Sequence, residues 1–108
     1  MYVCGSFKFS RELRELEKML RESDVDYIAS DETDGRGIRG CLERIDRADV
    51  VYVLNPGGYL GKSVSVDIGY SYAKGKPVYA LNTIDDPPVA ALLAGVLSER
   101  KLIELLRE

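Results

Sequence analysis

The chain has 108 residues, of which 45% are hydrophobic, and we expect one domain with a modest core that spans residues 1–108. Its net charge of −3 provides no basic surface for a nucleic acid polymer, although single nucleotides remain possible ligands. The absence of histidine excludes Ser-His-Asp and Cys-His nucleophile systems and histidine metal sites.

The first predicted strand is Tyr2–Cys4, and it ends at Gly5-Ser6, a turn that can present backbone amides to a ligand. Ser10 is the expected N-cap of the following helix. The apolar positions of that helix recur at helical spacing and predict its core face; they are Leu13, Leu16, Met19 and Leu20.

A second, shorter strand is predicted at 25–29, where Asp26 interrupts the apolar run and indicates the edge of a sheet. The polar, glycine-rich segment 30–40 is expected to be a mobile loop that borders a ligand; its acidic residues are Asp31, Glu32 and Asp34. The next helix is indicated by Ile38, Cys41, Leu42 and Ile45.

The segment 49–81 organises the rest of the chain. Residues 50–54 form an unbroken apolar run that predicts a buried parallel strand, and the loop Asn55–Gly61 follows. A helix over 63–74 and a strand over 78–81 complete the unit. This arrangement places the loop and the start of the helix at the carboxyl ends of the strands, where open α/β sheets bind their ligands.

Beyond this unit, Pro87 starts a short helix, and Ser98 is expected to cap a last amphipathic helix. Strands that alternate with helices favour an α/β fold. We predict a small doubly wound, flavodoxin-like parallel sheet of four to five strands in the order 2-1-3-4.

Asp67 is the leading candidate for chemistry, because it lies between Val66 and Ile68, where a charge is costly unless it is paired or used. The alternative is that Asp67 lies on the solvent face of its helix. Gly61-Lys62-Ser63 does not form a P-loop, since Pro56 occupies the position that requires the first glycine. The amides of 61–63 remain candidates to bind one phosphate, and an ordinary exposed turn is the alternative.

The sequence resembles the nucleoside 2-deoxyribosyltransferase superfamily, which includes the 2′-deoxynucleoside 5′-phosphate N-hydrolases. Three segments carry the resemblance: Tyr2-Val3-Cys4-Gly5-Ser6, Ile45-x-x-Ala48-Asp49-Val50-Val51, and 61–77 with Asp67-Ile68-Gly69-Tyr70 and Gly75-Lys76-Pro77. The resemblance implies cleavage or transfer at the N-glycosidic bond of 2′-deoxynucleosides or their 5′-monophosphates, without a metal or other cofactor. It also implies a homodimer or larger homo-oligomer.

By this resemblance, the catalytic residues are Asp67 as nucleophile and Tyr2 as the hydrogen-bond donor that orients it. The residues expected to bind the sugar and any 5′-phosphate lie in two loops: Gly5, Ser6, Lys8, Asn55, Gly61, Lys62 and Ser63. The family has a glutamate at the position of Asp67, an aspartate at that of Cys41 and a polar residue at that of Gly61. Aspartate is one methylene shorter than glutamate, and a misplacement of about 1 Å costs about a hundredfold in rate.

Three hypotheses follow from the sequence. The chain is an N-glycosidic enzyme, a catalytically impaired module that binds or senses nucleotides, or a structural domain; the two glycine loops disfavour the last. No apolar run approaches membrane-spanning length and no leader is evident, so we expect a cytoplasmic protein without a membrane partner. Its two cysteines are expected to be reduced, and its many charged residues favour a heat-adapted source.

Overall fold

Five parallel strands form the centre of the computed structural model, which describes all 108 residues. They are β1 (Tyr2–Gly5), β2 (Ile28–Ala29), β3 (Val51–Leu54), β4 (Val78–Ala80) and β5 (Gly95–Val96). The strands lie in the order β2-β1-β3-β4-β5, and every neighbouring pair is parallel. The predicted α/β class and the order 2-1-3-4 are therefore confirmed, and β5 extends the sheet beyond β4.

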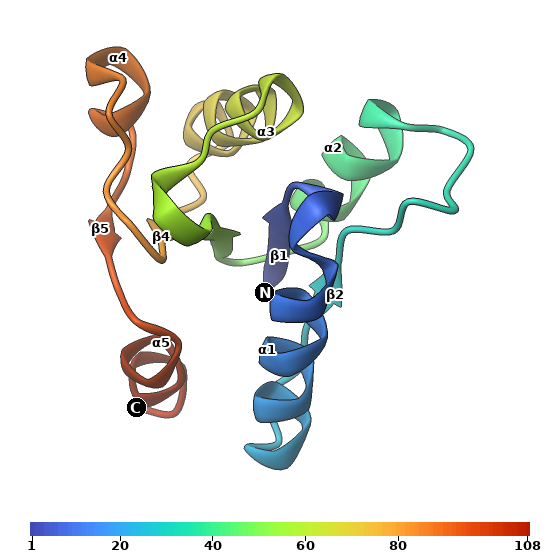
Figure 1. The fold of residues 1–108 in the computed structure, drawn as a ribbon, viewed down its shortest axis with the longest axis vertical. Coiled ribbons are helices and arrows are strands. Elements are labelled where there is room, and N and C mark those ends of the chain that lie inside the picture. Colours follow the sequence, from blue (N-terminus) through green and yellow to red (C-terminus); the bar gives the residue numbers. More distant parts are fainter.

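Helices cover both faces of this sheet. They are α1 (Ser10–Glu22), α2 (Ile38–Asp46), α3 (Lys62–Ala73), α4 (Pro87–Ala90) and α5 (Glu99–Leu106). Two 3₁₀ turns precede α1 and α3, namely η1 (Phe7–Phe9) and η2 (Pro56–Gly58). Figure 1 shows α1 and α5 on one side of the strands and α2, α3 and α4 on the other. No helix is long and apolar enough to cross a membrane.

The alternation of side chains along β1 divides the core into two clusters. Val3 packs with Leu16 and Leu20 of α1 on one face. Tyr2 and Cys4 belong to the cluster on the opposite face, which includes residues of α2 and α3. Because side chains on a strand alternate between faces, the two polar groups of β1 both lie beneath α3.

Two predicted element ends are wrong. Ser10 does not cap α1, because η1 runs directly into the helix, and Ser6 instead caps η1 by accepting a hydrogen bond from the Lys8 amide at 3.4 Å. The strand predicted from Val25 begins only at Ile28, since the preceding residues close α1. Asp24 has a φ of 56°, and the Val25 amide bonds to the Leu20 carbonyl, which is a Schellman ending.

Ser98 does cap the last helix, as predicted: its hydroxyl accepts a hydrogen bond from the Lys101 amide at 3.2 Å. The helix expected to begin at Ser63 starts one residue earlier, at Lys62, after Gly61.

Candidate active site

The loops that follow β1 and β3 meet at the carboxyl edge of the sheet. The Lys8 ammonium lies 3.7 Å from the centre of the Tyr59 ring, and the rings of Phe9 and Tyr59 contact edge to face at 5.7 Å. The backbone is also close here, because a Cβ on Gly5 would lie 2.7 Å from the Leu54 carbonyl oxygen. A glycine at the end of β1 thus brings the two loops together.

Asp67 lies in the interior, in the second turn of α3. Asp67 is 2% exposed, and its Oδ1 has no hydrogen-bond partner. Burial raises the pKa of this carboxyl group to about 7. The alternative that Asp67 lies on the solvent face is therefore wrong. A buried carboxylate without a donor is costly to the fold and marks a candidate functional group.

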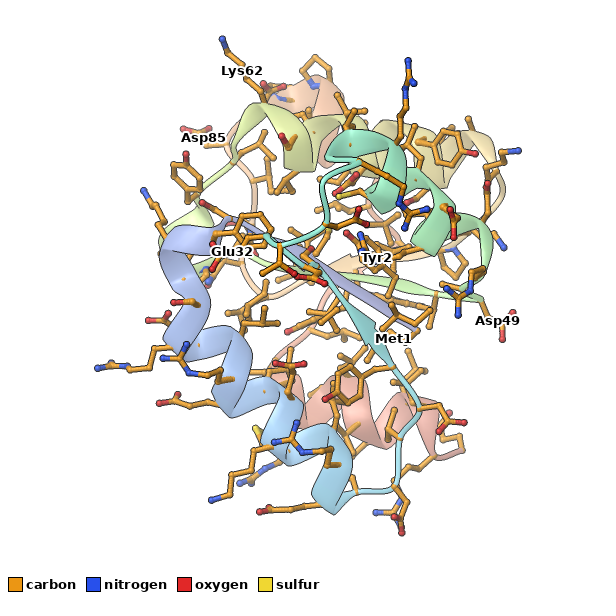
Figure 2. All side chains as sticks on the ribbon, turned by 90° about the vertical axis from the view of Figure 1, so that its right-hand side faces the viewer. Met1, Tyr2, Glu32, Asp49, Lys62 and Asp85 are labelled. Carbon is orange, nitrogen blue, oxygen red and sulfur yellow. The ribbon has the colours of Figure 1, made fainter.

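Tyr2 is fully buried on the same side of the sheet (Figure 2), and its hydroxyl lies 3.0 Å from Ser30 Oγ. Burial is the main cause that raises the pKa of Tyr2, the charge of Cys4 comes next, and the negative charge of Asp67 adds a smaller part, so Tyr2 lies within range of the Asp67 charge. The hydrogen bond that we expected between Tyr2 and Asp67 is not formed. The Tyr2 hydroxyl instead bonds to Ser30, on the loop after β2.

Both cysteines lie near this pair and are free thiols. The pKa of Cys4 is raised by burial first and then by the charges of Asp67 and Cys41. The strand alternation that places Tyr2 under α3 also places Cys4 there, so the position of Cys4 follows from the sequence. The position of Ser30 does not follow from it, because the contact of Ser30 with Tyr2 depends on how the loop after β2 returns to β1.

The remaining predicted binding residues divide into two groups. Gly61 precedes α3 without a side-chain cap, so the first amides of the helix, from Lys62 and Ser63, have no partner within it. Figure 2 shows Lys62 projecting outward at this edge, away from the buried Tyr2. Asn55, in contrast, is buried and bonds through both side-chain polar atoms to the backbone of Asn82. Its side chain joins the ends of β3 and β4.

The acidic loop after β2 is attached to α2. Asp34 accepts a hydrogen bond from Arg44 at 2.6 Å and also pairs with Arg36, which in turn bonds Glu43. Its approach depends on Gly40, where a Cβ would lie 2.3 Å from Asp34 Oδ2. Hydrogen bonds from Arg36, followed by one from Arg44, hold the pKa of Asp34 well below its usual range. This ion-pair network ties down the loop that leads from Ser30.

The surface cavities lie away from these residues. One of about 310 Å³ is lined by the end of α3 and the turn after α4, and two others lie around Asp24 at the amino edge of the sheet. None of them is lined by Asp67 or Tyr2, so the carboxyl group is covered in the isolated chain. No group of three or more cysteine and acidic side chains has the arrangement of a metal site.

Comparison with known proteins identifies the fold. No family model matches the chain, and no curated protein sequence matches it. Among solved structures, a 2-deoxyribosyltransferase from Bacillus psychrosaccharolyticus superposes with a TM-score of 0.67 at 17% identity, over 95% of this chain and 90% of the other. The chain has the nucleoside 2-deoxyribosyltransferase-like fold. The expected resemblance is thus confirmed at the level of the fold.

Two further structures share this deoxyribosyltransferase-like fold. A conserved protein from Enterococcus faecalis matches with a TM-score of 0.69 at 19% identity, over 99% of this chain and 97% of that one. A CMP N-glycosidase from Clostridium botulinum matches with a TM-score of 0.60 at 12% identity, over 99% of this chain and 98% of that one. Two of the three structures are named for an activity, as a 2-deoxyribosyltransferase and as a CMP N-glycosidase.

Proposed function

We propose that the protein cleaves or transfers at the N-glycosidic bond of 2′-deoxynucleosides or their 5′-monophosphates, with Asp67 as the nucleophile. The observation that carries this proposal is the buried carboxyl group of Asp67, on the helix α3 that follows the central strand β3. Its Oδ1 has no hydrogen-bond partner. The deoxyribosyltransferase and the CMP N-glycosidase with the same fold support the reaction class.

The mechanism follows from what the bond requires. As the base departs with the electron pair of the C–N bond and takes up a proton, positive charge develops on the sugar, and a carboxylate at about 3 Å from C1′ stabilises it or bonds to it. Water or a second base then attacks C1′ and loses a proton, the bond between C1′ and Asp67 breaks, and Asp67 is released as a carboxylate. The proton lost in this step balances the one that the departing base took up. The absence of a 2′-hydroxyl makes the cationic sugar easier to form.

The loops at the carboxyl edge supply the binding groups in this proposal. The first amides of α3, at Lys62 and Ser63, are free to donate hydrogen bonds to a phosphate or a sugar hydroxyl, and Ser6 and Lys8 lie on the loop after β1. Because no cavity reaches Asp67, these loops must open before a sugar can contact it. The movement of these loops also has to bring the sugar closer to Asp67, because aspartate is shorter than the glutamate that the deoxyribosyltransferase family has at this position.

The test is to incubate the protein with a panel of deoxynucleosides and deoxynucleoside 5′-monophosphates and to measure the released free base by chromatography. We expect release by the wild type and none by Asp67→Ala, with Asp26→Ala as the matched control because Asp26 is exposed at the opposite edge of the sheet. Base release by Asp67→Ala would assign the chemistry to another group. No release from any substrate at high protein concentration would refute the proposal.

A second candidate function is a module that binds nucleotides without cleaving them. Two observations favour it: the carboxyl group is covered, and Tyr2 bonds to Ser30 and not to Asp67. A nucleotide that binds only the folded protein stabilises it by mass action and so raises the melting temperature. At a nucleotide concentration of a hundred times the dissociation constant, the free energy of unfolding rises by about 2.7 kcal/mol. A thermal shift with nucleotides in the absence of base release would select this function.

We also propose that the protein acts as a homodimer. Helix α3 is apolar on both sides, since Val64 and Ile68 pack on the sheet while Val66 and Tyr72 are 49% and 60% exposed. Large contiguous apolar patches on a surface mark interaction sites, and a dimer formed through α3 would bury both of these side chains. Light scattering after size exclusion should give twice the mass of the chain, and Tyr72→Lys should reduce it; a monomeric wild type would contradict this.

A further inference from the structure

The position of the Tyr2 proton can be derived from the hydrogen bonds around Ser30. The Val3 carbonyl accepts from the Ser30 amide at 3.0 Å and from the Ser30 hydroxyl at 3.3 Å. A serine hydroxyl has one proton, and a carbonyl can only accept. The 3.0 Å contact between the Tyr2 hydroxyl and Ser30 Oγ by itself allows either group to donate. Directing the serine proton to Val3 leaves Ser30 Oγ as the acceptor and the Tyr2 hydroxyl as the donor.

The neighbouring Asp67 carboxyl group receives no such donor. Two titratable side chains of β1, Tyr2 and Cys4, lie within range of its charge, and Cys41 of α2 lies beside both of them. None of them is a cation, and burial is the only resolved influence on the carboxyl group. The one strong donor in this group, the Tyr2 hydroxyl, is used elsewhere.

We propose that Ser30 is a positioning residue that accepts the Tyr2 proton and thereby keeps the Asp67 carboxyl group free of a hydrogen-bond donor. This inference gains its catalytic meaning from the proposed function, because a carboxylate without a donor is the stronger nucleophile. Without a substrate, Tyr2 then lines the site but does not donate to Asp67. Ser30 determines which acceptor the Tyr2 hydroxyl uses.

Removing the Ser30 hydroxyl leaves two buried polar groups without partners. The Tyr2 hydroxyl loses its acceptor, and Asp67 Oδ1 already lacks a donor. A buried polar group without a partner destabilises the fold, so the two are driven to pair with each other. A hydrogen bond to the charged form favours that form, so Ser30→Ala should lower the pKa of Asp67 by about one unit.

The experiment is a carboxyl ¹³C NMR titration of protein labelled at aspartate, in which Asp67 is assigned by its loss in Asp67→Asn. We expect a lower pKa in Ser30→Ala and a wild-type pKa in Ser30→Thr, which keeps the hydroxyl. Tyr2→Phe should also leave the pKa near that of the wild type, with Tyr27→Phe as the control for loss of a tyrosine hydroxyl that bonds elsewhere.

An unchanged pKa in Ser30→Ala would overturn the inference, and so would a raised pKa in Tyr2→Phe, since Tyr2 would then already donate to Asp67. If Ser30→Ala does not fold, Tyr2→Phe and Ser30→Thr still decide between these outcomes. The titration needs no substrate, so it separates this inference from the proposed function. A shifted pKa without base release by any variant would support the positioning role and refute the enzyme.

Discussion

The substitution Asp67→Asn should remove most of the pH dependence of stability near neutral pH. The pKa of Asp67 is raised from 3.8 to about 7 by burial, so the folded state binds its proton more tightly than the unfolded state. The stabilisation is complete below the lower value and is lost as the pH rises to the upper one. A difference of about 3 units corresponds to about 4 kcal/mol.

About 2.5 kcal/mol of this loss falls between about pH 5 and about pH 8. The chain has no histidine, so no other side chain with an ordinary pKa near 6.5 titrates in that interval. The terminal amine is common to both proteins, and its effect cancels when wild type and Asp67→Asn are compared. The constant effect of a buried amide also cancels, because the comparison concerns the change with pH.

The measurement is urea unfolding of both proteins at the two pH values, with the free energy of unfolding extrapolated to water. The wild type should lose about 2.5 kcal/mol more than Asp67→Asn on going to the higher pH. Equal losses in the two proteins would show that the carboxyl group is not desolvated. Burial would then no longer identify Asp67 as the nucleophile.

Further predictions concern the chemistry and the framework. Base release should rise with pH through about 7, since the nucleophile must lose its proton, and a flat pH profile would count against Asp67. Gly5→Ala should lower the free energy of unfolding by about 1–3 kcal/mol, whereas Gly35→Ala, with nothing near its Cβ, should not. Asn82→Ala should cost about 1–3 kcal/mol by removing the side-chain amide that donates to the backbone carbonyl of the buried Asn55, and unchanged denaturant midpoints would contradict this. Arg44→Met should release the loop at Asp34 and speed tryptic cleavage after Arg36, measured by mass spectrometry; equal cleavage rates would show that the ion pair does not restrain the loop.

Local sequence patterns predicted the sheet order, because each strand is a short apolar run and the connections between them are helical. The edge strand β2 was predicted too long, since Asp24 adopts a left-handed conformation and Val25 completes the end of α1. Glycine, or sometimes asparagine, normally occupies the left-handed position at such an end, and here Asp24 occupies it.

The contacts of the site could be predicted only in part. The burial of Asp67 was anticipated from its apolar neighbours, but its missing donor could not be, because the partner of Tyr2 is 28 residues away. The attachment of Asp34 to Arg44 likewise depends on Gly40, whose missing side chain creates the space for a carboxylate. Contacts between loops depend on where the loops return, and residue spacing does not encode that.

The two outermost strands of the sheet, β2 and β5, have only two residues each. A lateral edge this short offers few unpaired amides and carbonyls to a foreign strand, which limits sheet extension and fibre-like growth. Association of this chain with other molecules should therefore proceed through its helical faces, and partially unfolded chains should have little template on which to aggregate.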